Sequence, residues 1–528
     1  MKKQTTIFAI LFIFASFMFP ATLEERIENI SKAEMQSVVE FLSHDLVEGR
    51  APGTRGGNLS ELYMKTLFKF MNLEPGADGK YLQPFKLQGF TAKELELTAN
   101  NVTLNYIEDI VGTYARNEAE FELEADAVFI GFGIATRHWK WDDYKGVDIK
   151  DKFVITRVND PGLFRPDKFD GKTLTYYGRW TYHIEEAARR GAAGILLIHT
   201  DRTAGYGWKV VKNSWAGEDL LLESDTRGTL KFRGWIKEDS LKKILRVRNI
   251  DIKELYRRSL KKKFKPMNLG FSIKVKGKNS FREVLNHNVV AEIPGKSKKR
   301  IVISAHIDHF GIKKHVKGDN IFNGAIDNGT AVAAMVMTAK ILKEFQKDLY
   351  YTVTVLACNA EEAGLLGSKY YVRHTNKENI ITNINFESTP VWEKARSIMG
   401  IGARYSTIED MLQILARKNN VGYSYFSMSE QGFFFRSDQF PFAQQGIPSV
   451  WLSAGEDDES GQNKYLSFWK ETYHTVKDEY DPAWELGGLK QTIKFGLLLI
   501  DHINRTREVP RWKRKLTFPT EGVGDPNR

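Results

Sequence analysis

The chain has 528 residues, 42% of them hydrophobic and 27% charged, which is the balance of folded globular proteins and excludes a disordered chain. This length predicts more than one domain. The formal net charge of +11 would permit binding to nucleic acid, but the basic runs lie far apart in the sequence and no nucleic-acid-reading motif accompanies them. We therefore expect no nucleic-acid partner.

The N-terminus has the pattern of a secretory signal. Met1-Lys2-Lys3 is a basic start, a mostly apolar run covers residues 7–19, and Pro20-Ala21-Thr22 follows. The run is too short to span a bilayer comfortably. Residues 1–21 are therefore predicted to be a signal peptide that exports the protein to the periplasm or the medium. Phe19 stands where cleavage prefers a small residue, so an uncleaved membrane anchor remains the alternative.

Residues 23–70 carry two helical patterns, separated by a loop rich in glycine and proline at 48–57. From about residue 118 the pattern changes to short strands with one helix, and aromatic and basic loops are expected at 200–265. The elements predicted in this stretch are strands at 127–133, 152–156 and 194–198 and a helix at 182–193. They predict a small, compact, β-rich domain inserted at 118–275.

After Asn288 strands alternate with helices, which is typical of an α/β domain on a mixed, mostly parallel sheet flanked by helices. The predicted strands are 300–305, 350–357, 380–386 and 449–453, and the predicted helix is 328–345. We expect this domain to combine residues 22–117 with 276–510, and 511–528 to be a basic C-terminal tail. Cys358, the only cysteine, is expected to be a buried small side chain.

Metal-binding side chains follow several of these strands at their carboxyl ends, the edge where open α/β sheets form their sites. His306, the pair Glu361-Glu362 and Glu387 each follow one predicted strand. Segments remote in sequence thus deliver imidazole and carboxylate groups to one edge. Zinc takes these ligands in hydrolytic sites, so the sequence predicts a zinc hydrolase.

Position suggests a role for each of these side chains. We assign His306 to a metal and Asp308 to the outer shell, where a carboxylate fixes the tautomer of an imidazole. Asp327 precedes a helix and could be its N-cap, but an aspartate bridging two metals is favoured in this setting. Adjacent glutamates cannot both face one metal, so we assign Glu362 as the ligand and Glu361 as the general base.

Tyr473 and His474 complete the set. The imidazole of His474 is a further candidate ligand, and the phenol of Tyr473 could donate a hydrogen bond to the oxyanion of a tetrahedral intermediate. His309 and His315 are competing candidates, but they fall in a polar loop without a paired carboxylate. Glu387 could instead be a solvated carboxylate at a strand end.

In this order the residues resemble the di-zinc metallopeptidases of family M28, which includes bacterial aminopeptidases and glutamate carboxypeptidases. The resemblance implies that His306, Asp327 and Glu387 bind one zinc ion, and that Asp327, Glu362 and His474 bind a second. It also implies that Glu361 is the base and Tyr473 the oxyanion donor. The motifs that carry it are His306-x-Asp308, Gly324-Ala325-Ile326-Asp327-Asn328, Glu361-Glu362-Ala363-Gly364, Glu387 and Tyr473-His474.

Two further stretches have family likenesses. Residues 120–200 resemble a protease-associated domain, and the segments that carry this likeness are Gly131-Phe132-Gly133, Asp142-Asp143-Tyr144 and the stretch from Glu185 to Gly194. Ser437-Asp438, followed by Gly446-Ile447-Pro448, is similar to the family's stretch near the substrate. Gln439 and Glu387 depart from the pattern, because many members have histidine and aspartate there, and the longer Glu387 could shift its metal.

The resemblance implies an enzyme that hydrolyses peptides with two zinc ions, and an aminopeptidase is the first expectation. Arg436, beside Ser437, could recognise a carboxylate, so a carboxypeptidase for acidic dipeptides remains open. A receptor-like binding protein without activity is the other alternative, although every ligand position is filled. The sequence does not predict the oligomeric state or the role of the inserted domain.

Overall fold

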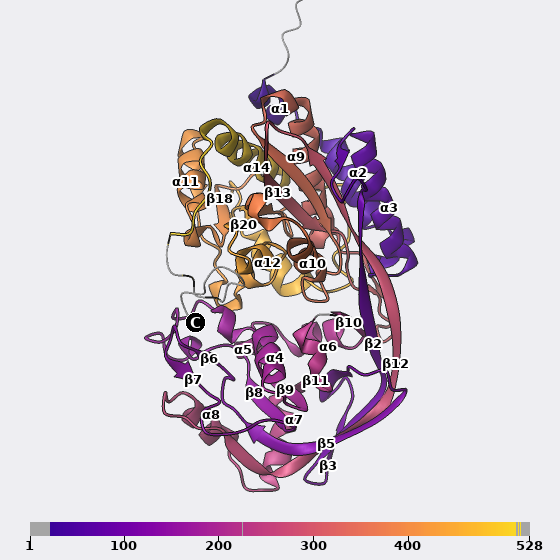
Figure 1. Cartoon of the computed structure of the whole chain (residues 1–528), viewed down its shortest axis with the longest axis vertical. Helices are drawn as coiled ribbons and strands as arrows, with labels where there is room; N and C mark the ends of the chain where they lie inside the picture. Colours follow the sequence, from indigo (N-terminus) through magenta and orange to yellow (C-terminus); the bar gives the residue numbers. More distant parts are fainter. Residues whose placement is uncertain (1–21, 224, 514–515, 517, 519–528) are drawn as a thin grey trace, which may run out of the picture.

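The computed structural model describes residues 22–223, 225–513, 516 and 518, and it shows two lobes joined by a pair of long strands (Figure 1). The predicted signal peptide and most of the predicted basic tail lie outside the described residues. Within those that are described, every helix is too short or too polar to cross a membrane.

The upper lobe in Figure 1 is built on a parallel sheet, as the alternation of strands and helices predicts. Its central strands are β13 (Ser297–His306), β16 (Tyr351–Cys358), β17 (Ile380–Asn385) and β20 (Ser449–Ala454). All residues of β16, β17 and β20 are buried, which is the pattern of parallel strands covered on both faces. At one edge the antiparallel strand β18 (Ser397–Ile401) pairs with β20, and β19 (Gly422–Tyr423) pairs with β18.

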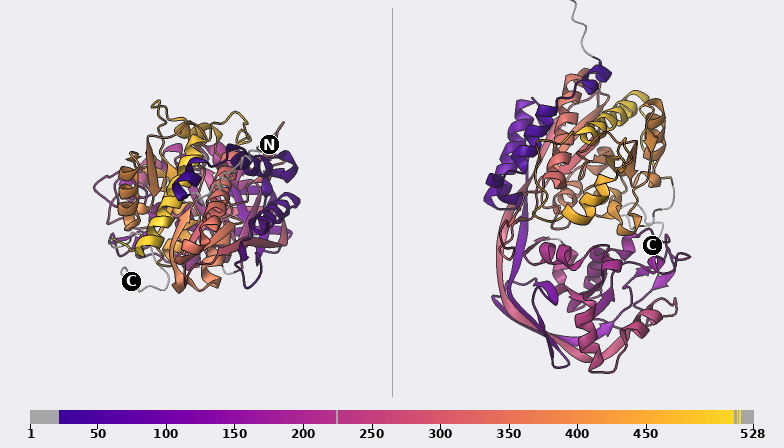
Figure 2. Two further views of the ribbon diagram at one scale, coloured as in Figure 1. Left: turned by 90° about the horizontal axis from the view of Figure 1, so that it is seen from above. Right: turned by 180° about the vertical axis from the view of Figure 1, so that it is seen from behind.

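Helices cover both faces of this sheet, as the two opposite views in Figures 1 and 2 show. The central one is α9 (Ala331–Glu344), which is apolar on almost all sides because it packs between β13, α2 and α14. It confirms the helix predicted at 328–345. The other helices of this lobe are α1 (Leu23–Glu28), α2 (Lys32–Leu42), η1 (Asp45–Arg50), α3 (Arg55–Phe70), α10 (Leu366–His374), α11 (Ile408–Lys418), α12 (Gln439–Gln444), α13 (Lys464–Ser467) and α14 (Gly487–Thr506).

The lower lobe has its own parallel strands and its own hydrophobic core. Its strands are β5 (Glu120–Phe129), β8 (Phe153–Arg157), β9 (Gly194–His199) and β11 (Phe232–Lys237), with β4 (Ile110–Tyr114) antiparallel at the edge. The helix α4 (Trp180–Arg189) lies between β8 and β9 in sequence. Strands and helices both contribute, so the lobe is α/β. Its assignment as a protease-associated domain stays a prediction.

The expectation of loops at 200–265 is wrong. Its described residues form four α-helices, one short 3-10 helix and two strands: α5 (Asp201–Ala204), α6 (Trp208–Trp215), β10 (Glu218–Leu222), η4 (Thr226–Thr229), β11, α7 (Glu238–Arg246) and α8 (Ile252–Ser259). In α7 the buried side chains are mainly Leu241, Ile244 and Leu245, while lysine and arginine fill the outer face. Helices α7 and α8 have only nine and eight residues, fewer than the roughly 11 to 18 residues over which helical periodicity is usually judged.

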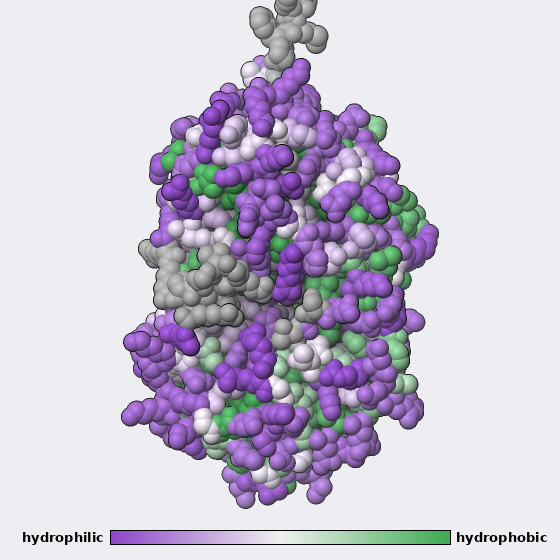
Figure 3. All heavy atoms as spheres, in the orientation of Figure 1, coloured by the Kyte–Doolittle hydropathy of each residue, from purple (hydrophilic) through white to green (hydrophobic). Residues whose placement is uncertain are grey.

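Two long antiparallel strands, β2 (Leu82–Ala99) and β12 (Met267–Ile293), run along one side of both lobes (Figures 1 and 2). We call this pair the ribbon. The end of β12 pairs with β16 in the upper lobe, and its beginning pairs with β5 in the lower lobe. The ribbon was not predicted, although charged and apolar side chains alternate along residues 94–97 and 273–276, which is the period of a half-buried strand. These charges pair across the strands, as in Lys276–Glu96 at 3.0 Å. Hydrophilic side chains likewise cover most of the face seen in Figure 3.

Close packing within the ribbon predicts a stability effect at Gly277. A Cβ added there would lie 2.0 Å from the backbone oxygen of Glu94, so the two strands would have to separate locally. We expect Gly277→Ala to lower the free energy of unfolding by about 2 kcal/mol in urea titrations. The control Gly207→Ala adds a Cβ with no atom within 4 Å and should change it by less than about 0.5 kcal/mol. Equal losses in the two variants would contradict the close packing.

Candidate metal centre and cleft

Parallel pairing brings the predicted ligands to one edge of the upper sheet. His306 ends β13 and is in register with Cys358, the last residue of β16, and Glu387 lies two residues after β17. The turn with Glu361 and Glu362 follows β16 directly. Cys358 is fully buried, which confirms its expected packing role.

Asp327 lies at the centre of the arrangement, in the short segment η5 (Ala325–Thr330) before α9, and its peptide bond to Asn328 is cis. One carboxylate oxygen, Oδ1, is 3.3 Å from Nε2 of His306. The other, Oδ2, is 3.3 Å from Nε2 of His474. Each half of one carboxylate therefore faces a different imidazole.

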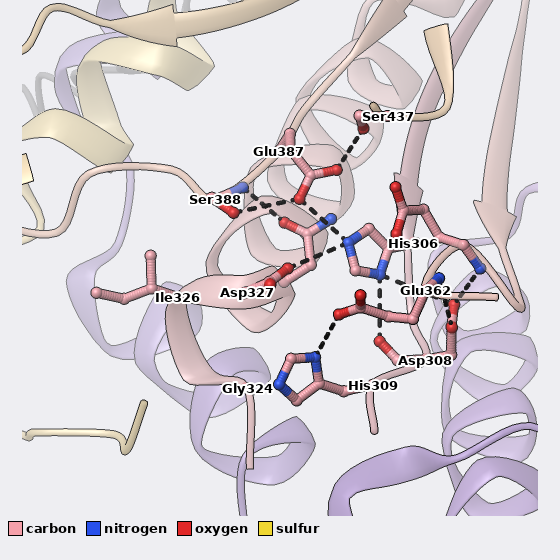
Figure 4. A network of polar contacts seen from close by, with 12 residues as sticks. His306, Asp308, His309, Gly324, Ile326, Asp327, Glu362, Glu387, Ser388 and Ser437 are labelled. Carbon is pink, nitrogen blue, oxygen red and sulfur yellow. Dashed lines mark hydrogen bonds and ion pairs between the residues drawn. The ribbon is translucent and has the colours of Figure 1, made fainter. Parts of the chain in front are cut away.

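Each of the two histidines also lies close to a second carboxylate. Nε2 of His306 is 3.1 Å from Oε1 of Glu387, and Nε2 of His474 is 3.3 Å from Oε2 of Glu362. Figure 4 shows Asp327 and Glu387 converging on His306. The two triads that the resemblance implied, which share Asp327, are thus brought together.

These separations fit metal coordination. Two ligand atoms about 2.0–2.1 Å from a tetrahedral zinc ion lie roughly 3.3 Å apart. Oδ2 of Asp327 and Nε2 of His474 are also buried without a hydrogen-bond partner, which is costly unless something else binds them. Each triad can therefore hold one divalent cation, with Asp327 as the bridge.

The adjacent glutamates have different surroundings. Glu362 faces His474 and also lies 2.7 Å from Nδ1 of His309. The expectation that His309 has no paired carboxylate is therefore wrong, and His309 groups with Asp327 and Glu362 as a further candidate ligand. Burial opposes its ionisation, but the charge of His474 and the two histidine contacts lower its pKa to about 2. Burial raises the pKa of Glu361 well above its ordinary value, and the carboxylates of Glu362 and Glu387 add to this effect while His306 opposes it. A bound cation would favour the ionised form of Glu361.

Asp308 acts differently from the expectation. Nδ1 of His306 lies 3.1 Å from the backbone oxygen of Asp308 and 3.8 Å from its carboxylate. The carboxylate instead accepts hydrogen bonds from the N–H groups of Glu361 and Glu362, at 3.0 and 3.3 Å. Asp308 therefore joins the end of β13 to the glutamate turn, and a carbonyl fixes the imidazole.

Of residues 436–439, only Arg436 lines the cavity beside the metal centre, and the other three lie in the interior. Ser437 donates a hydrogen bond to Glu387, and buried Asp438 accepts one from Ser368 of α10. Neither of these two lines the cavity beside the metal centre, so their expected contact with substrate is replaced by a role behind the ligands. Gln439 is buried and donates to the carbonyl of Phe434 at 2.8 Å.

A cavity of about 150 Å³ opens beside the centre and is lined by residues of both lobes. We call it the first cavity. Glu361, Tyr473 and His474 line it, and the phenol oxygen of Tyr473 accepts a hydrogen bond from Arg436 at 3.0 Å. From the lower lobe comes Arg179, buried, with its Nε unpaired. Arg179 was not predicted, because nothing in the sequence places residue 179 beside the centre.

A second contact from the lower lobe reaches the glutamate turn. Arg227 pairs with Asp225 and donates to the carbonyl of Ala363 at 3.2 Å. Its guanidinium leaves no room for a side chain at Gly364, where an added Cβ would lie 2.8 Å from Nη1. The two lobes therefore meet directly at the residue after Glu362.

Sequence reasoning also missed two residues that hold the ligand loops. Arg50 is buried and donates to the carbonyls of Ile307 at 2.8 Å and Gly324 at 3.0 Å, so it links the loops after β13 and before α9. The carboxylate of Asp478 accepts from the N–H groups of Ile326 and Asp327 at 2.8 and 2.9 Å. Two features of the sequence could have pointed to them: Arg50 lies within the glycine-rich stretch 48–57, and Asp478 follows the candidate ligand His474 by four residues.

This fold with this donor set is that of the metallopeptidase class. Residues 288–493 match the family model of peptidase family M28, so the chain carries an M28 peptidase domain. Among curated relatives, the aminopeptidase YwaD of Bacillus subtilis is 29% identical over 182 residues, 33% of this chain and 37% of that protein. Carboxypeptidase G2 of Pseudomonas sp. is 30% identical over 146 residues, 26% of this chain and 34% of that one. Each match spans about a third of the relative's length.

Similar solved structures extend over nearly the whole chain. The aminopeptidase from Aneurinibacillus sp. strain AM-1 has a TM-score of 0.53 at 17% identity, covering 95% of this chain and 99% of that one. BSAP, a zinc aminopeptidase from Bacillus subtilis, has a TM-score of 0.50 at 17% identity, covering 93% and 98%. At this identity the likeness establishes the fold.

The role of Arg50 can be tested through metal affinity. We expect Arg50→Lys to weaken zinc binding roughly 10- to 100-fold, because a lysine cannot hold both loops at once. Competition with a chromogenic chelator measures the change. The control is Arg55→Lys, at an exposed side chain that pairs with Glu48 on the surface. Unchanged affinity in the Arg50 variant would contradict the assignment.

Proposed function

We propose that this protein is a di-zinc exopeptidase, and that it is an aminopeptidase releasing N-terminal residues. The observation that carries the proposal is the position of Asp327, with each carboxylate oxygen 3.3 Å from a different histidine. Two metals about 3.5–4 Å apart need a shared anion between them. The aminopeptidase named among the relatives supports the choice of substrate.

The chain's own residues can carry the proton transfers. Two zinc ions, when bound, would supply Lewis acidity and lower the pKa of a water toward neutrality. Glu361 lies close to His306 and Glu387 but, among the described residues, forms no direct ion pair with a histidine, so it can accept the proton of the attacking water and pass it to the departing amine. Tyr473 can donate its hydroxyl proton to the carbonyl oxygen as negative charge develops there, while Arg436 holds the phenol in place.

The mechanism predicts a separation of metal binding from turnover. Glu361→Gln should keep both zinc ions and lower kcat by about 10²- to 10⁴-fold, because the amide cannot accept a proton. Glu362→Gln is the matched comparison and should lose zinc, since it removes a ligand. Elemental analysis and peptide hydrolysis measure the two effects. Full activity in the Glu361 variant would remove it from the mechanism, and wild-type protein that binds no zinc would favour a receptor-like protein.

A carboxypeptidase remains the second candidate, and one observation favours it. Arg179 joins Arg436 at the first cavity. Burial lowers the pKa of Arg179 to about 10, and the positive charge of Arg436 is the next largest cause of this shift. Arg179 is buried and Arg436 half-buried, and neither pairs with a carboxylate among the described residues, so both are suited to a ligand with a carboxylate. The match to carboxypeptidase G2 is consistent with this candidate.

Substrate kinetics distinguish the two candidates. We expect kcat/KM for leucyl-nitroanilide to exceed that for N-blocked dipeptides ending in glutamate by roughly tenfold or more, because only one end of the peptide can be bound correctly at the centre. The reverse order would establish the carboxypeptidase. Export through residues 1–21 stays a prediction, and cell fractionation with N-terminal sequencing would test it.

A further inference from the structure

A second cavity of about 550 Å³ lies between the lobes next to the first. Phe310, Glu362 and Ala363 line both cavities, so the two meet at the metal centre. The walls of the second cavity come from the hairpin after β13 and from the lower-lobe segment around Gly217. A peptide held at the centre can therefore extend into either cavity.

In the second cavity the acidic side chains have partners, whereas Lys313 has none among the described residues. Glu48 pairs with Arg55 and Glu218 with Arg282, Asp308 binds the N–H of Glu361, and Glu362 faces two histidines.

Lys313 differs from these acids. It is buried, and among the described residues its ammonium group makes no hydrogen bond or ion pair. The group lies 5.1 Å from the ring of Phe310 and close to the backbone of Gly217.

Two other unpaired polar atoms line the same cavity. Nε2 of His309 and Nε2 of His315 are both buried without a hydrogen-bond partner. Burial and the charge of Lys313 lower the pKa of His315, so its ring is neutral at pH 7. Burial also lowers the pKa of Lys313 to about 8, although Glu362 and Glu218 oppose the shift. The Lys313 side chain is largely buried, but its ammonium group is open to the cavity and has no counter-ion among the described residues, so an anionic ligand there would gain a charge-assisted contact.

We propose that the second cavity is a subsite for a carboxylate of the peptide, and that Lys313 binds this carboxylate. The proposal rests on the proposed peptidase function and adds a substrate class to it: peptides with a carboxylate beyond the residue at the metal centre. The carboxylate can be the C-terminus of a short peptide or the side chain of an aspartate or glutamate. Both sources present the same group to the lysine.

Binding of short peptides tests the subsite without turnover in the Glu361→Gln protein, which is expected to keep zinc and lose most hydrolysis. The zinc-loaded full-length variant is titrated by calorimetry with Gly-Gly-Gly and its C-terminal amide, and with Gly-Glu-Gly amide and Gly-Gln-Gly amide. We expect the acid form to bind about tenfold more tightly in at least one pair, since a charge-assisted hydrogen bond is lost in the other member. The first pair reports a terminal carboxylate and the second a side-chain carboxylate.

Three variants assign the effect to one side chain. Lys313→Met should abolish the preference and Lys313→Arg should keep most of it. Lys317→Met, at an exposed lysine of the same hairpin, should leave it unchanged. Each of these changes is made in the Glu361→Gln protein. Equal binding of acid and amide forms by Glu361→Gln alone, or an undiminished preference after Lys313→Met, would overturn the proposal. Failure to hydrolyse any peptide would instead remove the proposed function, and the calorimetric result would still decide the subsite.

Discussion

The structure depends on holding several carboxylates close together at one edge of the upper sheet, although like charges repel one another. Neighbouring residues stabilise the loops that carry these carboxylates. Two like charges 4 Å apart repel by about 4 kcal/mol at the effective dielectric near a protein surface. His306 and His474 offset part of this repulsion, and cations between the carboxylates would offset far more. The neighbouring residues act mainly on the backbone: Arg50 binds loop carbonyls, and Asp308 and Asp478 bind loop N–H groups.

The ligands could be predicted because strand ends in a parallel sheet meet at one edge, and this argument needs only the order of strands along the chain. It placed His306, Glu387 and the glutamate pair correctly relative to one another. The same reasoning could not find Arg50 or Arg179, because their burial depends on contacts between segments far apart in sequence. Ser437 and Asp438 were expected near the substrate from the family resemblance, and a motif likeness does not show where a side chain points.

The fold was predictable to a similar extent. Buried parallel strands such as β16 and β17 are continuous apolar runs and were found. The ribbon strands β2 and β12 have charged residues on one exposed face and were not. The small basic helices of the lower lobe were missed for a related reason: their buried faces are only a few residues long.

The lower lobe is part of the centre's surroundings, although its sequence interrupts the upper lobe. Arg227 binds the carbonyl next to Glu362, and the ring of Tyr176 packs 5.1 Å from that of Phe440 in α12. Both cavities beside the metal centre are consequently lined from two sides. A fragment with only the M28 segment would lack one wall of each.

The ribbon has a mechanical consequence. In many two-lobed proteins a short flexible connection acts as a hinge, but here β2 and β12 are hydrogen-bonded to each other between Leu82 and Ala99, across the junction. Any separation of the lobes must therefore bend or twist these paired strands, whose register shifts once, between Lys278 and Asn279. Cutting one peptide bond in β2 would leave β12 as an intact tether between the halves.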